Sequence, residues 1–184
     1  MTDQEKSFIE SCIEGDLKSM ILCIKHNVNV NVENDWVISI CARKHHHKIA
    51  KYLLSKNLVS HKSASTKGLL AYACNSNNFE FVKHLISQSD EYKTDSAAFS
   101  WTASNGNIKI AELLVNYLNS DCLQGGFCRA AEVGHIQFLE FLFLNSIDDI
   151  DNSANRAIHW AKGGNRDKVI IYLSNNGLGL KNET

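Results

Sequence analysis

The chain has 184 residues, about the length of one domain, of which 44% are hydrophobic and 21% charged. This composition excludes an intrinsically disordered chain, and a net charge of −1 from 19 basic and 20 acidic residues disfavours a strongly basic nucleic-acid binder. No apolar run approaches the roughly 20 residues of a membrane span, and the polar N-terminus lacks the apolar stretch of a signal peptide. We therefore expect a cytoplasmic protein without a membrane partner.

A segment of about 30 residues recurs six times along the chain. Each copy aligns on one turn residue, and in chain order these are Gly15, His45, Asn77, Gly106, Gly134 and Gly164. Successive turn residues lie 30, 32, 29, 28 and 30 positions apart. Glycine, asparagine and histidine tolerate the left-handed backbone that often ends a helix, and the chain contains no proline. The alignment predicts six units, each with a first helix, a tight turn, a second helix and a polar connection.

Two columns of this alignment predict the buried face of each first helix. A small side chain stands three residues before every turn: Cys12, Ala42, Cys74, Ala103, Ala131 and Ala161. A large apolar side chain stands seven residues before the turn in all units but the last: Phe8, Ile38, Leu70, Phe99, Phe127 and Ala157. Positions four apart share one face of a helix, so we expect both columns to pack against neighbouring helices.

The second helices carry an apolar stripe at two, five, eight and nine residues after the turn, which is a helical period. The last unit departs from this stripe, since Arg166 and Lys168 stand where neighbouring units carry apolar residues. A repeat array needs polar outer faces on its end units, so we interpret the first and last units as caps. At the start of the chain, Thr2 and Glu5 predict a capping box.

These features resemble the ankyrin repeat family. The small pair Ala130-Ala131, the turn Gly134-His135 and the second-helix pattern Ile108…Ile110-Ala111…Leu113-Leu114 match its motif. No unit has the Thr-Pro-Leu-His opening, and the period is about three residues short of the usual ~33. The same period argues against tetratricopeptide, HEAT and armadillo repeats.

The resemblance covers roughly Phe8 to Leu173 and implies an all-α fold. We expect a curved ankyrin-type solenoid of about six helix-turn-helix repeats, with short or irregular hairpin connections, in a single domain over residues 1–184. The approximate repeats are 3–33, 34–64, 65–94, 95–122, 123–152 and 153–178, followed by a tail over 179–184.

The cysteines and histidines do not form a recognisable metal motif. We interpret four cysteines as core residues: Cys12, Cys23, Cys41 and Cys74. Two others lie nearer the connections, and we expect them to be exposed: Cys122 and Cys128. His45, His46 and His47 are consecutive, so their side chains diverge and fit a turn better than a metal site.

No motif of an enzyme is present either. The chain lacks the glycine-rich loops that bind phosphates, and the pairs Gly125-Gly126 and Gly163-Gly164 fall at junctions between units, where turn geometry explains them. The acidic run 148–151 lacks the later glycine and glutamate of a calcium loop. We expect no catalytic residue, no cofactor and no metal.

A basic segment lies between Asp35 and Glu80, where no acidic residue occurs. It holds Arg43, Lys44, Lys48, Lys51, Lys56, Lys62 and Lys67. Such a segment is either a solvated surface or an electrostatic footprint for an acidic partner. Nucleic acid is the weaker form of the second interpretation, because no motif of a nucleic-acid reader accompanies it. Our candidates for partner binding are Arg43, Lys44, Lys48 and Lys51.

A second candidate surface is the column two residues after the large apolar one, which reads Glu10, Ile40, Tyr72, Trp101, Arg129 and His159. Tyrosine, tryptophan and arginine dominate interface hot spots. The resemblance implies that first helices line the concave face with which ankyrin proteins bind partners, so our candidates are Tyr72, Trp101, Arg129 and His159. Alternatively, this column is half-buried between helices. We interpret Trp36 and Trp160 as packing or capping residues.

The favoured function is therefore a non-enzymatic module, monomeric because its ends are polar, that binds another protein. Alternatives are a nucleic-acid-associated protein that uses the basic second unit, or an enzyme or metal protein whose site these motifs miss. The proline-free composition, rich in Asn, Ser, Ile and Lys, suggests an AT-rich genome. Divergent ankyrin arrays look like those of large DNA viruses, phages, intracellular bacteria and some protists. A host protein that is captured or inhibited in the host cytoplasm is then the expected partner.

Overall fold

A computed structural model describes residues 1–30, 36–59, 68–92, 95–145 and 150–178. Across these residues the regular structure is entirely helical, which confirms the prediction of an all-α chain. In this part of the chain, none of the helices combines the length and the apolarity that crossing a membrane requires. The chain divides into two compact units, Met1–Tyr92 and Lys93–Thr184, and each is described by itself.

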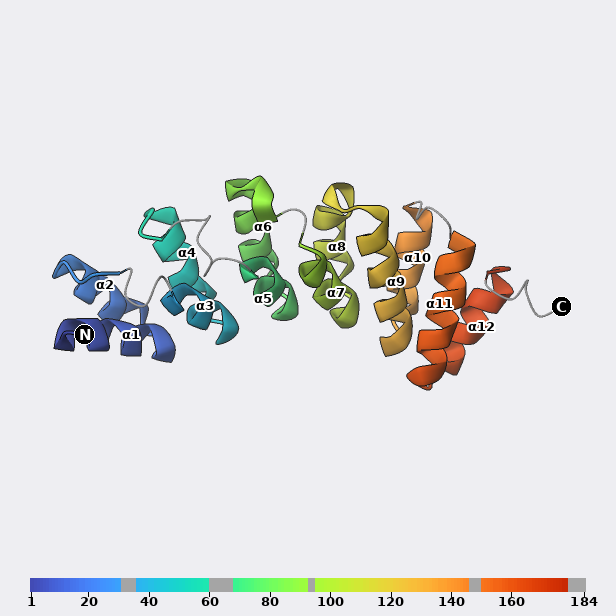
Figure 1. Cartoon of the computed structure of the whole chain (residues 1–184), viewed down its shortest axis with the longest axis horizontal. Coiled ribbons are helices and arrows are strands. Elements are labelled where there is room, and N and C mark those ends of the chain that lie inside the picture. The colour runs from blue at the N-terminus through green and yellow to red at the C-terminus, as the bar shows by residue number, and fades with distance from the viewer. Residues whose placement is uncertain (31–35, 60–67, 93–94, 146–149, 179–184) are drawn as a thin grey trace. The chain divides into compact units, whose positions relative to one another are not determined.

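The first compact unit contains three pairs of helices and a short 3₁₀ helix (Figure 1). They are α1 (Asp3–Glu14) with α2 (Leu17–Lys25), α3 (Trp36–Arg43) with α4 (His47–Ser55), and α5 (Leu69–Asn75) with α6 (Phe79–Gln88), followed by η2 (Asp90–Tyr92). The two helices of each pair pack together, and the first helix of one pair also packs against the first helix of the next.

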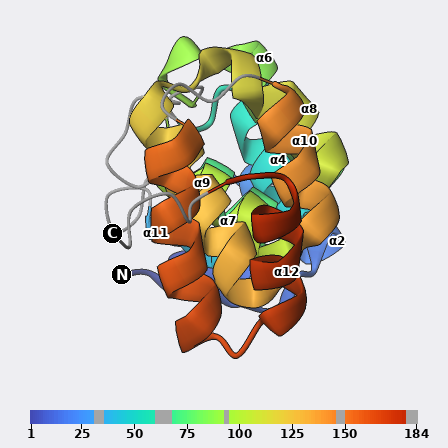
Figure 2. The ribbon, with the colours of Figure 1, turned by 90° about the vertical axis from the view of Figure 1, so that its right-hand side faces the viewer.

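The second compact unit repeats this arrangement. Its pairs are α7 (Ser96–Asn105) with α8 (Ile108–Leu114), which η3 (Val115–Tyr117) extends, α9 (Ser120–Val133) with α10 (Ile136–Leu144), and α11 (Ile150–Gly163) with α12 (Asp167–Asn175). Helix α9 packs against both α7 and α11. In Figure 2 the pair α11 and α12 faces the viewer, with α9 and α10 behind it. We call α1, α3, α5, α7, α9 and α11 the first helices.

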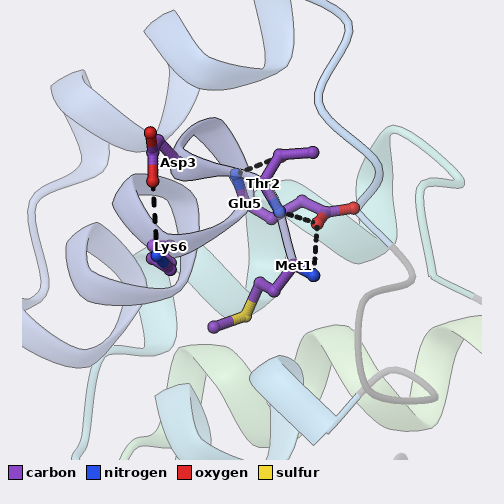
Figure 3. A network of polar contacts seen from close by, with 5 residues as sticks. All are labelled: Met1, Thr2, Asp3, Glu5 and Lys6. Carbon is purple, nitrogen blue, oxygen red and sulfur yellow. Dashed lines mark hydrogen bonds and ion pairs between the residues drawn. The ribbon is translucent and has the colours of Figure 1, made fainter.

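The predicted capping box at the start of α1 is confirmed (Figure 3). The backbone N–H of Glu5 donates to Thr2 Oγ1 over 3.2 Å, and the backbone N–H of Thr2 donates to Glu5 Oε2 over 2.6 Å. The Glu5 carboxylate also lies 3.9 Å from the terminal ammonium of Met1, and Lys6 Nζ lies 3.3 Å from Asp3 Oδ1. The two hydrogen bonds between Thr2 and Glu5 satisfy backbone donors that a helix start leaves without partners inside the helix.

Both buried columns predicted for the first helices are confirmed. Every small residue of the first column and every residue of the large apolar column is buried, including Ala157. A small side chain lets neighbouring helices approach closely, and the large one four residues earlier fills the space beside it. In the second compact unit the ring of Phe99 on α7 also lies near that of Phe138 on α10, with 5.9 Å between centroids.

The turn residues follow the predicted register in five units, but not in the last. Gly15, His45, Asn77, Gly106 and Gly134 have positive φ angles, whereas in the last unit Asn165, not Gly164, takes this conformation. A β-carbon on Gly164 would collide with the backbone carbonyl oxygen of Glu132, so a close approach between helices requires this glycine.

Counted from the left-handed residue, the last unit lies one position later than the alignment assumed. Three residues separate α11 from α12, as they separate α3 from α4 and α5 from α6. The apolar position that Ile110 occupies in the fourth unit is therefore filled by the buried Val169, and Lys168 falls in an exposed position. The interpretation of Arg166 and Lys168 as polar substitutes in the apolar stripe was wrong for this reason. The capping role of the two end units stays a prediction.

Three turns are tied to the preceding unit by the residue that follows the left-handed position. His46 Nε2 lies 3.1 Å from the backbone oxygen of Ile13, and His135 Nε2 lies 2.9 Å from that of Ser104. In the last unit Arg166 Nε donates to the backbone oxygen of Glu132 over 3.2 Å. Each acceptor belongs to the last turn of a first helix, where carbonyl groups lack partners within the helix.

Gly125 and Gly126 lie inside α9 and not at a junction between units, so turn geometry does not explain them. A β-carbon on Gly126 would lie 2.5 Å from Cε1 of Phe99, which shows why this position is glycine. A β-carbon on Gly125 would meet no atom within 4 Å.

The two neighbouring glycines give a matched test of this packing. We expect Gly126→Ala to lower the free energy of unfolding by about 1–3 kcal/mol, because the added methyl group overpacks the contact with Phe99. We expect Gly125→Ala to raise it by up to about 1 kcal/mol, because alanine is the better helix former. Urea denaturation of both variants measures the difference, and equal effects would contradict the assigned packing.

Candidate interaction sites

The second compact unit exposes part of the predicted column on its first helices. Trp101 on α7 is 42% exposed, Arg129 on α9 is half-buried, and His159 on α11 is exposed. In the first compact unit, Tyr72 on α5 is half-buried. Two members of the column, Trp101 and His159, are therefore exposed. The alternative prediction, that the column is half-buried between helices, describes Arg129 and Tyr72.

A cleft of about 310 Å³ lies over α9, with α7 on one side and α11 on the other. It brings Trp101 and Arg129 together, whereas His159 is not part of its lining. Only Trp101 and Arg129 of its lining residues were predicted; the missed residues include Arg156 and Trp160, the latter 47% exposed. They stand four positions apart, which places them on one face of α11, and this spacing is the sequence signal that could have identified them. The other lining residues include Ser104, Gly125, Cys128 and Glu132.

Hydrogen bonds fix the guanidinium group of Arg129. Its Nε donates to Ser104 Oγ and its Nη1 donates to Glu132 Oε2, both over 2.6 Å. The Glu132 carboxylate offsets the charge of Arg129. Nη1 of Arg156 donates instead to the neutral Gln124 Oε1 over 3.2 Å, and Arg156 forms no ion pair with any described residue. Among the described residues, Arg129 thus has a carboxylate partner and Arg156 has none.

The cysteine near this cleft is not a reactive thiol. The prediction that Cys128 is exposed was wrong: it lies within α9 and is buried, and burial raises the pKa of its thiol. Burial also raises the pKa of the half-buried Cys122. A hydrogen bond with Cys12, together with burial, raises the pKa of Cys41. Because the thiolate is the nucleophilic form, these three residues are suited to packing.

The basic segment presents a separate surface in the first compact unit. Arg43 and Lys44 follow each other at the end of α3, and Lys48 and Lys51 lie in the first turns of α4. All four side chains are exposed, and none forms an ion pair with a described residue. Lysine near the start of a helix is electrostatically unfavourable, so the dipole of α4 does not explain Lys48 and Lys51. Lys62 and Lys67 lie outside the described residues, as do residues 148 and 149 of the acidic run and most of the predicted hairpins.

The three consecutive histidines have three different environments. His45 adopts the left-handed turn, His46 contacts the preceding unit, and His47 points into the core. They therefore do not converge on one point. Over the described ranges, no group of three or more histidine, cysteine or acidic side chains is arranged to hold a metal ion.

His47 is a buried, neutral imidazole. Its Nε2 lies 2.7 Å from Ser76 Oγ, and that hydroxyl also lies within hydrogen-bonding distance of the backbone oxygens of Tyr72 and Ala73. Since the hydroxyl has one proton to donate, the arrangement favours a proton on His47 Nε2. Its Nδ1 has no partner among the described atoms. Burial, reinforced by repulsion from His45 and His46, lowers the pKa of His47 to about 4.

Because burial lowers the pKa of His47, we expect the protein to lose stability in mild acid. The unfolded chain binds a proton at His47 below pH 6.5, whereas the folded chain resists it down to about pH 4. The free energy of unfolding should therefore fall as the pH is lowered from 6.5 to 4, by about 3 kcal/mol from this residue. In His47→Gln, whose amide can donate to Ser76 but does not titrate, this component should disappear.

Denaturation at a series of pH values measures the effect. The control is His159→Gln, which removes an exposed histidine and should leave the pH dependence unchanged. An unchanged pH dependence in His47→Gln would show that the buried ring is not its source.

No protein-family model matches the chain, and no curated protein matches it. The functional interpretation of the two candidate surfaces, the tryptophan-lined cleft of the second compact unit and the basic segment of the first, therefore depends on their own geometry.

Proposed function

We propose that the chain is a divergent ankyrin-repeat protein whose first helices bind another protein. Three features support the family assignment. A unit of about 30 residues recurs six times, each unit pairs two helices through a left-handed turn, and both predicted columns are buried. The short period and the absent Thr-Pro-Leu-His opening make this array divergent.

The observation that carries the binding proposal is the cleft between Trp101 and Trp160. Monomeric proteins commonly expose single apolar residues, but here two large indoles flank one hollow that also holds two arginines. Tryptophan and arginine are the residues that contribute most to protein interfaces. The core of the fold does not use these surfaces, since both indoles are more than 40% exposed.

We further propose that the protein is not an enzyme. The groups best suited to chemistry already have structural roles: His46 and His135 join neighbouring units, and His47 is buried and neutral. The thiols of Cys41 and Cys128 are held protonated. Fold alone does not establish function, so this proposal depends on the roles of these particular side chains.

The composition supports a proposed setting. A proline-free chain rich in asparagine, serine, isoleucine and lysine fits an AT-rich genome, such as that of a virus, a phage or an intracellular bacterium. We propose that the partner is a host protein, captured or inhibited in the host cytoplasm by a monomer of this chain.

The basic segment supports a second candidate function, the binding of an acidic protein or of nucleic acid. Its four described cations are exposed and lack carboxylate partners in the described part of the chain. Binding that depends on phosphate contacts weakens steeply as salt concentration rises. The affinity at two salt concentrations therefore separates this candidate from binding at the cleft.

Affinity capture with the full chain tests the proposal. Wild type is compared with Trp101→Ala/Arg129→Ala and with a variant in which Lys44, Lys48 and Lys51 are changed to glutamate. We expect the first variant to lose the protein that wild type captures, with affinity reduced about tenfold or more. The control is Phe143→Ala, because Phe143 is a similarly exposed aromatic residue (39%) on the second helix α10.

Two results would count against binding through the cleft. Full capture by the Trp101→Ala/Arg129→Ala variant would place the site elsewhere. Loss only in the lysine variant, with recovery of nucleic acid or an acidic protein by wild type, would favour the basic segment.

A further inference from the structure

Gly125 is the residue of the cleft that packing does not explain. It lies near the middle of α9, a helix of 14 residues, where glycine is less stabilising than alanine. Its neighbour Gly126 is required by the contact with Phe99, but a β-carbon on Gly125 would meet no atom within 4 Å. The position is exposed. The absence of a side chain here leaves the floor of the cleft open.

The resulting hollow has the size and walls of a site for a bulky side chain. Its volume of about 310 Å³ is at the lower end of the roughly 300–1,000 Å³ of ligand pockets. Trp101 on α7 and Trp160 on α11 flank it across α9. Indole rings offer large apolar surfaces at small conformational cost, so an apolar side chain placed above Gly125 would contact both walls.

The charge of the cleft favours a single carboxylate. Glu132 offsets Arg129, whereas Arg156 has no ion-pair partner among the described residues, so the three groups together carry a net charge of +1. A guanidinium group binds a carboxylate through paired hydrogen bonds. A polyanion is disfavoured, because residues 93–184 contain 8 basic and 10 acidic residues, a net charge of −2.

We propose that this cleft binds a segment of a partner protein in which a bulky apolar residue stands next to an aspartate or glutamate. The apolar side chain occupies the space above Gly125 between the two indoles, and the neighbouring carboxylate pairs with Arg156. This inference rests on the proposed function, since it specifies what the first helices of the second compact unit recognise.

A displayed library of random linear peptides, selected on the full chain, provides the probe. Synthetic peptides made from the enriched sequences are then titrated into ¹⁵N-labelled protein. The chain has three tryptophans, so the indole N–H signals of Trp101 and Trp160 report on the cleft and that of Trp36, in the first compact unit, serves as an internal reference. We expect the first two signals to shift and the third to remain in place.

Two substitutions test the roles of the floor and of the charge. Gly125→Leu adds an apolar side chain whose β-carbon meets no atom within 4 Å, and by occupying the hollow it should weaken peptide binding about tenfold or more. Arg156→Gln should weaken the binding of the acidic peptides and not of their neutral analogues. The control is Gly163→Leu, which adds the same side chain at another helical glycine with open space around its β-carbon position. This control should bind as wild type does.

Several outcomes would overturn the inference. The first is a selection that enriches no peptide, or only peptides without acidic residues. The second is a set of peptides that bind Gly125→Leu as tightly as wild type. The third is a titration with oligouridylate, an RNA probe, that shifts the indole signals when the peptides do not. Peptides lost in Trp101→Ala/Arg129→Ala but retained in Gly125→Leu and Arg156→Gln would refute the inference alone. Peptides retained in all of these variants would count against the proposed function as well.

Discussion

A hydrogen bond from the turn of one unit to the end of the preceding first helix is the contact that joins three of the units to their neighbours. A helix leaves its last carbonyl groups without partners, and here His46, His135 and Arg166 each reach one of them. The contact also restricts the turn beneath it. Because the ring of His135 lies 2.9 Å from the β-carbon position of Gly106, a larger residue at that turn would displace the donor. The turn glycine and the donor one unit later therefore depend on each other.

This construction leaves one side of each first helix available for function. The small and large columns are directed into the core, and the turns are occupied by contacts between units. The remaining face in the second compact unit holds Trp101, Arg129 and Trp160, whose positions are set by helices packed on both sides of α9. A binding surface built on packed helices changes little in shape on binding, which lowers the entropic cost of association.

Periodicity predicted the parts of the fold that recur, and it failed where one unit differs. The buried columns, five of the six turns and the Thr2 capping box follow from local rules that each unit repeats. In the last unit the left-handed position is Asn165, one residue later than the alignment assumed, and Gly164 is instead required by a close approach to Glu132. The cleft was missed in part because its walls come from different units. The spacing of Arg156 and Trp160 places them on one face of α11, but only the packing of α7, α9 and α11 shows that this face lines a cleft with Trp101.

We propose that the first helices of the second compact unit, and not its second helices, contact the partner. Amide hydrogen exchange of the full chain, measured with and without the protein that it captures, distinguishes the two sets of helices. We expect slower exchange in α7, α9 and α11 on binding, with α8, α10 and α12 unchanged. Slower exchange confined to α8, α10 and α12, or to the basic segment of α3 and α4, would contradict this proposal.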